Sequence, residues 1–277
     1  MIALALIAIG TLINESASSV GKWAVRAHKE SLYTMGFLDL FWVTIVFTAW
    51  VAYTGTWALQ LQSLPYFFIR AIVELCVLVA GLKATARVDR GTYTLITVLT
   101  IPLVLVVDYA VGFNIPNNAL WGMLLIIVAF IILFARHSID TKGIKYAFTW
   151  TIGVVATIAL FKHNITYYNT VEGEQFWMTL ILLAYVTLMA VFHDKKNPLR
   201  AVFVYPSSLQ SLARGLAVPI LNFSYALGVA SVIVTGKRAF SIIWALASGS
   251  HYFHERHIVT KILGAILVIA GIICLAL

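Results

Sequence analysis

Runs of about twenty apolar residues follow one another along almost the whole chain, and only short polar segments separate them. About 20 apolar residues in a helix are needed to cross a bilayer. Only 11% of the 277 residues are charged and 61% are apolar, whereas a soluble domain carries about 25% charged residues. The sequence therefore predicts an all-α polytopic membrane protein, with residues 1–277 forming one membrane domain.

Ten runs of spanning length can be placed along the chain. They lie at Ile2–Gly21, Met35–Tyr53, Phe67–Ala86, Thr92–Val111, Ala119–Ala135, Ile144–Phe161, Phe176–Phe192, Leu209–Val234, Ala239–Phe253 and Val259–Leu277. Pro102 and Pro219 fall inside two of the runs, where a membrane helix tolerates a kink. No basic segment precedes the first run, so we expect a retained helix and not a cleaved signal peptide.

The two sets of five runs resemble each other. A shift of 142 residues places Gly122 on Gly264, and apolar residues then match on both sides of the two glycines. An odd number of helices in each repeat turns the second copy upside down in the membrane. We therefore predict two inverted five-helix repeats, over about residues 1–138 and 139–277.

The basic residues predict the orientation in the membrane. Fifteen of the nineteen Lys and Arg residues lie in or beside the loops that follow odd-numbered runs. The even-numbered loops are assigned the other four, Arg70, Lys162, Lys237 and Arg238. By the positive-inside rule the odd loops are cytoplasmic and both termini lie outside. This pattern explains the net charge of +8 without a nucleic-acid partner.

Four segments near the C-terminus carry a resemblance to a known family. They are Ala226–Ser231, Lys237–Ser241, Phe253–Arg256 and Gly264–Gly271. Together they resemble the closing half of an EamA-type transporter of the drug/metabolite transporter superfamily. In that family a Gly-Glu-Arg-like turn precedes a Gly-rich last helix, and His254 stands here in place of the Gly.

The resemblance implies ten helices in two inverted repeats around a central solute cavity, with no cofactor. It also implies a prokaryotic inner (plasma) membrane protein that moves a small solute among membrane lipids, as a monomer or a homodimer. Ten-helix members of the family keep both termini in the cytoplasm, whereas the charges of this chain favour the opposite orientation.

Ionisable side chains within apolar runs are the first candidates for a functional site. Glu15 lies about two-thirds along the first run, next to Asn14. The stretch from Asn14 to Lys22 resembles the first helix of the small multidrug resistance proteins, which implies binding of protons or a cationic solute by the carboxylate. The alternatives for Glu15 are an ion pair with a basic side chain or an interfacial position. Glu74 can pair with Arg70, four residues earlier on the same helical face.

Aromatic and amide side chains in the middle of the runs are candidates for the wall of a cavity. These are Trp150, Asn222, Tyr225 and Trp244. A Trp residue is also typical of lipid packing or of an interfacial belt, whereas an amide in mid-membrane must find a partner.

His251, His254 and His257 have a spacing that could bring three imidazoles together. This spacing leaves headgroup contact, pH sensing and metal binding open. Cys76 and Cys274 fit neither a disulfide framework nor a metal motif, and the sequence has no P-loop, dinucleotide fingerprint or nucleophile elbow.

We predict a secondary active transporter that works by alternating access and not an enzyme, with proton coupling through Glu15. The first alternative is a flippase for a lipid or lipid-linked precursor, and the second is a membrane-embedded metal enzyme that uses the three histidines.

Overall fold

The computed structural model describes residues 2–27, 30–110, 143–227, 230–253 and 258–276, together with 121, 122, 124, 125, 127–129 and 131. Over these residues the chain is all-helical and has no strand. The all-α prediction is therefore confirmed for the described part. Most of the fifth predicted run, Ala119–Ala135, lies outside the described residues.

The helices differ in length but most are long. In chain order they are α1 (Ile2–Arg26), α2 (Leu32–Thr54), the short 3-10 helix η1 (Leu61–Ser63), α3 (Leu64–Arg87), α4 (Arg90–Thr97), α5 (Thr100–Ala110), α7 (Ile144–Tyr167), α8 (Val171–Phe192), α9 (Pro198–Val202), α10 (Ser207–Ser224), α11 (Ala230–Phe253) and α12 (Ile258–Ala276). Ser31 and Thr170 begin α2 and α8 by accepting hydrogen bonds from the backbone N–H groups of Thr34 and Gly173, which satisfies donors that the first turn leaves open.

Four helical stretches in the described residues are long and apolar enough to cross a membrane. They are Leu32–Thr54, Thr92–Ala110, Ile144–Tyr167 and Val171–Phe192. Four other long helices, α1, α3, α10 and α11, each carry at least one charged residue away from their ends. Because charged side chains within a membrane turn away from lipid, we expect a functional site to lie between these four helices.

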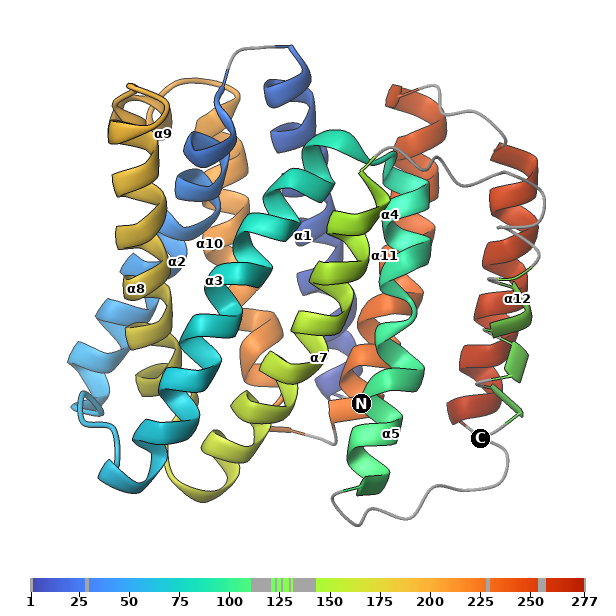
Figure 1. Cartoon of the computed structure of the whole chain (residues 1–277), viewed down its shortest axis with the longest axis horizontal. Coiled ribbons are helices and arrows are strands. Elements are labelled where there is room, and N and C mark those ends of the chain that lie inside the picture. The colour runs from blue at the N-terminus through green and yellow to red at the C-terminus, as the bar shows by residue number, and fades with distance from the viewer. Residues whose placement is uncertain are drawn as a thin grey trace.

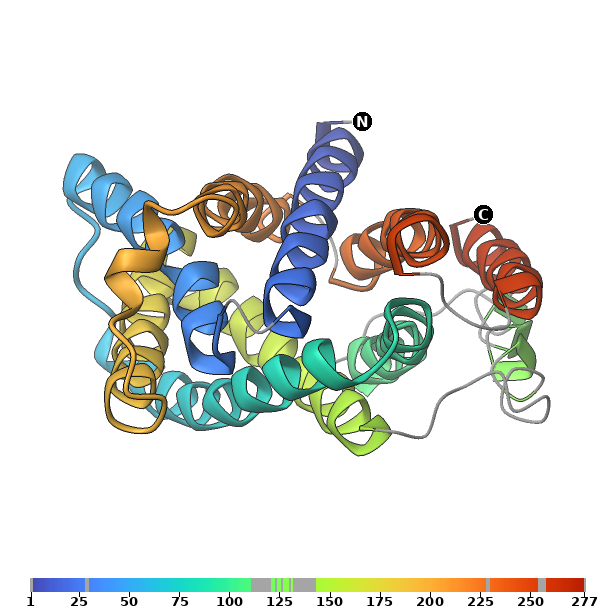
Figure 2. The ribbon, with the colours of Figure 1, turned by 90° about the horizontal axis from the view of Figure 1, so that it is seen from above.

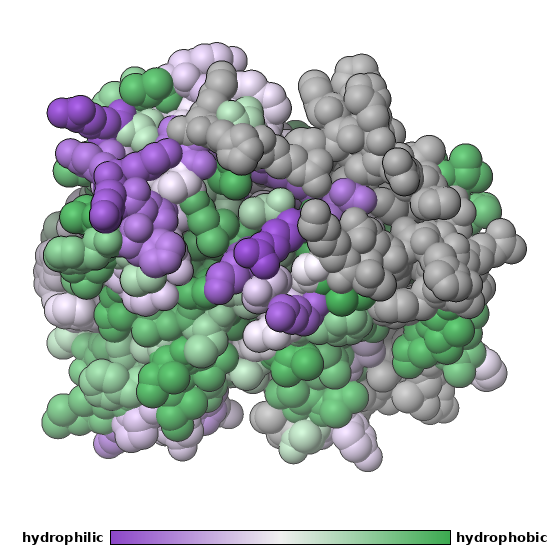
Figure 3. Space-filling view, turned by 45° about the horizontal axis from the view of Figure 1, so that its top comes forward, coloured by the Kyte–Doolittle hydropathy of each residue, from purple (hydrophilic) through white to green (hydrophobic). Residues whose placement is uncertain are grey.

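The long helices run side by side, and α1, α2 and α3 alternate in direction, as do α7, α8 and α10 (Figure 1). Seen from above, α8 and α9 lie at one side of the molecule and α12 at the other (Figure 2). The connection that holds α9 lies at the same end as the turns after α1 and α3 (Figure 1). Figure 3 shows hydrophilic side chains gathered toward this end and a mostly hydrophobic surface below them.

The closest packing joins helices of the first half of the chain to helices of the second half. The principal pairs are α1 with α10, α3 with α7, and α2 with α8, and α2 also packs on α10. Glycine permits one of these approaches directly. A Cβ atom on Gly215 of α10 would lie 2.5 Å from the Cβ atom of Trp42 and 3.3 Å from its backbone carbon.

The run predicted at Thr92–Val111 is interrupted between α4 and α5. Pro102 has no N–H group for the carbonyl of Val98, and that carbonyl instead accepts from the N–H of Ile101 at 2.9 Å. The helical hydrogen-bonding pattern therefore changes next to Pro102, as expected for a kink at this proline.

The predicted boundary between the eighth and ninth runs is wrong. The sequence suggested a loop around Lys237 and Arg238, but both residues lie inside α11. The chain instead leaves α10 at Ser224, where the N–H groups of Tyr225 and Leu227 bond to carbonyls three residues earlier.

This correction changes the charge count of the loops. All four cations that the sequence assigned to even-numbered loops lie on helices: Arg70 on α3, Lys162 on α7, and Lys237 and Arg238 on α11. Arg214, counted with an odd-numbered loop, lies on α10. The described connections 55–60, 168–170 and 225–227 contain no Lys or Arg.

Candidate functional site

Charged and polar residues of α1 and α11 lie together inside the helical bundle, with Glu74 of α3 in electrostatic range of them, and we call this group the central cluster. Its members are Glu15, Glu74, Lys237, Arg238 and Ser241. Lys237 lies within electrostatic range of both Glu15 and Glu74. Glu15 is the fourteenth of the 25 residues of α1, so with about 1.5 Å of rise for each residue it lies near the middle of that helix. The cluster is therefore remote from both ends of the bundle.

Arg238 is held in a defined orientation. Its side chain is 6% exposed, and Nε donates a hydrogen bond to Oγ1 of Thr100 at 3.0 Å. The guanidinium lies over the ring of Trp150, 5.1 Å from the ring centroid. Within the described residues this is its one hydrogen bond, so the Nη1 and Nη2 groups retain donors for another molecule.

Lys237 lies beside this guanidinium and is partly buried. In the described part of the chain it makes no hydrogen bond and no ion pair within 4.0 Å. Its charge is repelled by Arg238 and Arg214 and attracted by Glu15 and Glu74. A partly buried ammonium group without a close carboxylate is costly.

Glu15 reaches across the bundle from α1 to α11, where its carboxylate accepts a hydrogen bond from the Ser241 hydroxyl. It also interacts electrostatically with both Lys237 and Arg238. The carboxylate thus lies beside two cations without forming a close ion pair with either of these two.

Beside the central cluster lies a second network, the Asp39–Arg214 network, which joins α1, α2 and α10. Arg214 Nε donates to Asp39 Oδ1 at 2.8 Å, and its Nη atoms donate to Asn14 Oδ1 and to Ser18 Oγ. Gln210 donates to the same Asp39 oxygen at 2.9 Å. Asn14, a predicted site residue, is thus a partner of Arg214 and lies next to the central cluster.

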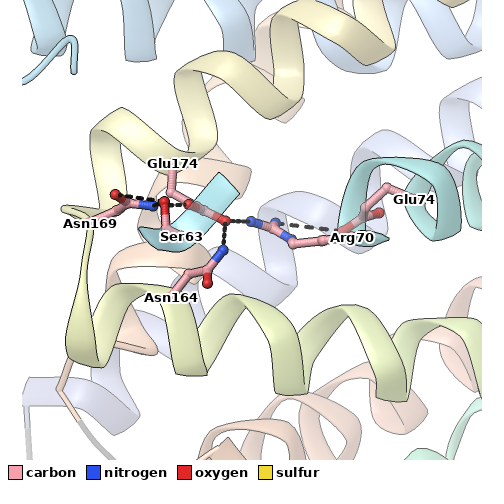
Figure 4. Close-up of polar contacts among 6 residues, drawn as sticks. All are labelled: Ser63, Arg70, Glu74, Asn164, Asn169 and Glu174. Atoms are coloured by element: carbon pink, nitrogen blue, oxygen red, sulfur yellow. Dashed lines mark hydrogen bonds and ion pairs between the residues drawn. The ribbon is translucent and has the colours of Figure 1, made fainter. Parts of the chain in front are cut away.

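A third network surrounds Glu174 near the start of α8, and we call it the Glu174 network (Figure 4). The fully buried Glu174 carboxylate accepts from Arg70 and Asn164 at 2.9 Å each and from Asn169 at 2.6 Å. Asn169 in turn donates to Ser63 Oγ at 3.0 Å. These bonds fasten α8 to α3 and α7.

Arg70 connects this network to the central cluster. Its Nη2 lies 3.6 Å from a carboxylate oxygen of Glu74, so the pair predicted from the i,i+4 spacing is present. The shorter contact of Arg70, however, is the one to Glu174 at 2.9 Å. Glu74 is therefore only loosely paired, and it also interacts electrostatically with Lys237.

Of the aromatic and amide candidates, the structure places two at the central cluster. Trp150 lies under Arg238, and the buried Tyr225 interacts electrostatically with Arg238 and Glu74. Asn222 is partly buried on the last turn of α10, and Trp244 lies further along α11 with 38% of its surface exposed. The structure does not bring Asn222 and Trp244 into hydrogen-bonding contact with the cluster.

A pocket of about 480 Å³ opens near the end of the bundle where α5 and α7 finish. It is mostly apolar, and its polar wall includes Asp108, Lys162 and His163. Lys162 donates to the carbonyl of Tyr225 at 2.8 Å. Because Tyr225 also interacts electrostatically with Arg238, it connects the pocket wall to the central cluster.

The histidine cluster falls largely outside the described residues. His254 and His257 are not among them, and of His251 only its place on α11 is described. In the described part of the chain, no group of three or more His, Cys, Asp or Glu residues could hold a metal ion.

Sequence reasoning missed several members of these networks. The sequence predicts a loop at Lys237 and Arg238, and Glu174 lies before the apolar run predicted to begin at Phe176. Apolar residues flank the Lys-Arg pair on both sides, Ile233-Val234 before it and Phe240 after it, and this pattern was the available signal for a charged pair inside a helix.

Comparison with known protein families and with curated proteins finds no match to this chain. The function is therefore argued from the geometry of the three networks.

Proposed function

We propose that this protein is a secondary active transporter that moves a small solute across a membrane by alternating access. The observation that carries the proposal is the central cluster, where charged side chains from three helices lie within electrostatic range of one another in a bundle that includes four apolar helical stretches of spanning length. Ionisable residues within a membrane are costly and are typical of substrate or ion pathways.

The pattern of helix pairs supports an inverted repeat. In such a repeat the first, second and third helices correspond to the sixth, seventh and eighth, which here are α7, α8 and α10. This exchange converts the pair α1–α10 into the pair α7–α3, and it leaves α2–α8 unchanged. These three pairs are the strongest contacts of the bundle, as expected for two halves that rock around a shared site, whereas the contact of α2 with α10 has only a weak counterpart between α8 and α3.

We further propose that the fold is of the EamA type, with ten helices in the drug/metabolite transporter arrangement. The resemblance of the C-terminal segments and the pairing pattern support this assignment.

Glu15 is the proposed site of proton coupling. The elements packed around α1 are α2, α3, α10 and α11. The ionisable groups whose side chains are described there are Asp39, Arg70, Glu74, Cys76, Lys83, Arg87, Tyr33, Tyr53, Tyr66, Arg214, Lys237 and Arg238, with Lys22 on α1 itself. Of these, Lys237 and Arg238 interact directly with Glu15. Protonation of Glu15 would remove the attraction that it exerts on both cations, which couples its charge to the arrangement of α11.

The test begins with a thermal-shift screen of purified protein against metabolite classes, because a ligand that binds the folded state raises Tm. A hit is then followed in proteoliposomes with and without a pH gradient. Gradient-driven accumulation by the wild type, reduced at least about tenfold in Glu15→Gln, is the expected result. No uptake of any stabilising ligand above protein-free liposomes would contradict the proposal, and movement of labelled lipids alone would favour a flippase.

A further inference from the structure

The connection between α8 and α10 carries exposed apolar side chains next to exposed cations, and we call residues 192–205 the α9 segment. Lys195, Lys196 and Arg200 are exposed. The exposed apolar side chains have exposed fractions between 51% and 80%, and they are Phe192, Leu199, Phe203, Val204 and Tyr205. A contiguous exposed apolar group beside polar residues is typical of a surface that another molecule or a membrane covers.

The α9 segment begins where a helix of spanning length ends. α8 is long and apolar enough to cross a membrane, and its last residue is Phe192. Its 22 residues, with a rise of about 1.5 Å each, match a hydrocarbon thickness of about 30 Å. α9 lies at one side of the molecule (Figure 2). The exposed side of the segment is therefore at the level where a bilayer changes from acyl chains to headgroups.

Contacts on the inner side fix the shape of the α9 segment. Ala201 and Val202 are buried in one apolar cluster with residues of α2 and α8. Asn197 begins the helix by accepting a hydrogen bond from the N–H of Leu199 at 3.1 Å. The segment thus presents its outer side without first having to fold, which lowers the entropy cost of binding a ligand there.

The three cations of the segment have no acidic partner. Among the described residues, none of them has a carboxylate oxygen within 4.0 Å. The two acids beside the segment are engaged elsewhere. Asp194 accepts from the N–H of Tyr33 and pairs with His193, and Glu30 accepts from the hydroxyl of Ser207. The counter-charge must therefore come from another molecule, and phosphate is a group that Lys and Arg bind well.

We propose that the α9 segment binds the headgroups of anionic phospholipids at the surface of the membrane. Its exposed apolar side chains enter the boundary between headgroups and acyl chains, as amphipathic segments do at membrane interfaces. Its three cations lie beside the lipid phosphates, where each basic residue adds to the attraction of an anionic surface. This inference rests on the proposed membrane location of the bundle and does not depend on transport or on the central cluster.

Quenching by brominated lipid measures which lipid contacts the segment. In a background without Cys76 and Cys274, Val204→Cys carries a fluorophore, and the full chain is placed in nanodiscs of equal parts phosphatidylglycerol and phosphatidylcholine. Bromine is placed on the acyl chains of one lipid or of the other. We expect the quenching constant to be at least about fivefold larger for phosphatidylglycerol, which is the factor that one basic residue supplies near an anionic surface.

Lys196→Gln combined with Arg200→Gln should reduce this preference to less than half, because two of the three cations are lost. Arg87→Gln combined with Lys145→Gln is the matched control. It removes one exposed arginine and one exposed lysine near the same end of the bundle, and the preference at position 204 should stay unchanged. If the first combination is not folded, salt provides the test, since about 1 M salt shortens the Debye length from about 10 Å to about 3 Å and should weaken the preference.

Equal quenching by the two lipids, or an undiminished preference after loss of both cations, would overturn the anionic headgroup site. Quenching by aqueous iodide alone would place the segment in water, and protection from every quencher would show that a second copy or another protein covers it. Either result would overturn the assignment to lipid. Loss of the preference on addition of soluble glycerol phosphate would assign the cations to a soluble phosphate and would overturn it as well.

A label on α7 separates failure of this inference from failure of the membrane proposal. Ile152 lies on a helical stretch of spanning length and is 63% exposed, so a label at Ile152→Cys should be quenched by either brominated lipid. Quenching at position 152 without quenching at position 204 would refute only the headgroup site. No quenching at either position would refute the membrane location on which the proposed function depends.

Discussion

Among single residues, Glu174 has the strongest structural role. Its buried carboxylate accepts three hydrogen bonds, and one of them comes from the charged Arg70. Glu174→Gln should lower the free energy of unfolding by about 3 kcal/mol, because removing one partner leaves a buried charge poorly paired. Glu74 at 3.6 Å from Arg70 keeps the loss at the lower end of the known range.

Unfolding by SDS titration in mixed micelles measures this difference. Glu172→Gln makes the same change two residues away, at a partly buried side chain that accepts from Thr56 at 3.2 Å. We expect this control to stay within about 0.5 kcal/mol of the wild type. Equal losses in the two variants would show that the Glu174 network does not stabilise the bundle.

Asp194 lies two positions after the last residue of α8, and the pKa of its carboxyl group is lowered in the folded protein. Partial burial by itself would raise its pKa, but hydrogen bonds from Ser31, His193 and the N–H of Tyr33 together hold the pKa below its usual value. A carboxylate with a lowered pKa in the folded state stabilises the protein above its unfolded pKa of about 3.9 and loses this contribution as the pH falls through the folded value.

The wild type should therefore have a higher Tm than Asp194→Asn at neutral pH, and the two values should converge as the pH falls below about 4. Tm measured across this range in detergent checks the prediction. A gap of constant size down to the lowest pH would mean that the carboxylate charge contributes nothing.

At the residue scale the sequence predicted part of the site. Glu15 and Glu74 are candidates from the sequence because a charge inside an apolar run is costly and is usually functional. The Arg70–Glu74 pair follows from the helical i,i+4 spacing. Partners far apart in sequence could not be predicted, since the hydrogen bond between Ser241 and Glu15 joins residues 226 positions apart. Which helices become neighbours depends on packing, and periodicity does not encode it.

At the scale of elements, the helices were predicted better than their ends. Predicted runs coincide with α2, α7 and α8, which are long and apolar enough to cross a membrane, because hydrophobic length is a strong signal. The boundary between α10 and α11 was wrong because charge was taken as the mark of a loop. The true end of α10 lies after Ser224, and Arg238 is accommodated within α11 because Thr100 and Trp150 receive it.

Gly215 controls the approach of α10 to α2. Gly215→Ala should cost about 1–3 kcal/mol, because the added Cβ atom meets the backbone and Cβ of Trp42, which cannot move without shifting the helix. Leu216→Ala is the control on the adjacent position, where the side chain is 61% exposed. An unfolding free energy that falls no more in Gly215→Ala than in the control would show that the helices can separate freely.

At the scale of the whole molecule, the distribution of charge predicts orientation. The described connections at one end contain Lys195, Lys196 and Arg200, whereas those at the other end contain no Lys or Arg. By the positive-inside rule we predict that the basic end faces the cytoplasm. The correction of Lys237 and Arg238 to a helix makes this asymmetry sharper than the sequence suggested.

Cysteine labelling in whole cells tests the orientation. In a background without Cys76 and Cys274, an impermeant reagent added outside should label Gln62→Cys and should not label Asn197→Cys. Both positions are exposed and lie at opposite ends of the bundle. Labelling of Asn197→Cys alone would mean that both termini are cytoplasmic.

The Lys-Arg pair inside α11 also has a consequence for biosynthesis. Each basic residue at the centre of a helix opposes insertion by about 2.5–3.5 kcal/mol, so α11 is a poor candidate for entering the bilayer alone. The ribosome makes Glu15, Thr100 and Trp150 earlier, so the groups that receive Lys237 and Arg238 already exist when α11 emerges. Insertion of α11 would then depend on earlier helices that have already packed together. Truncation before α11 would remove the hydrogen bond that Ser241 donates to Glu15.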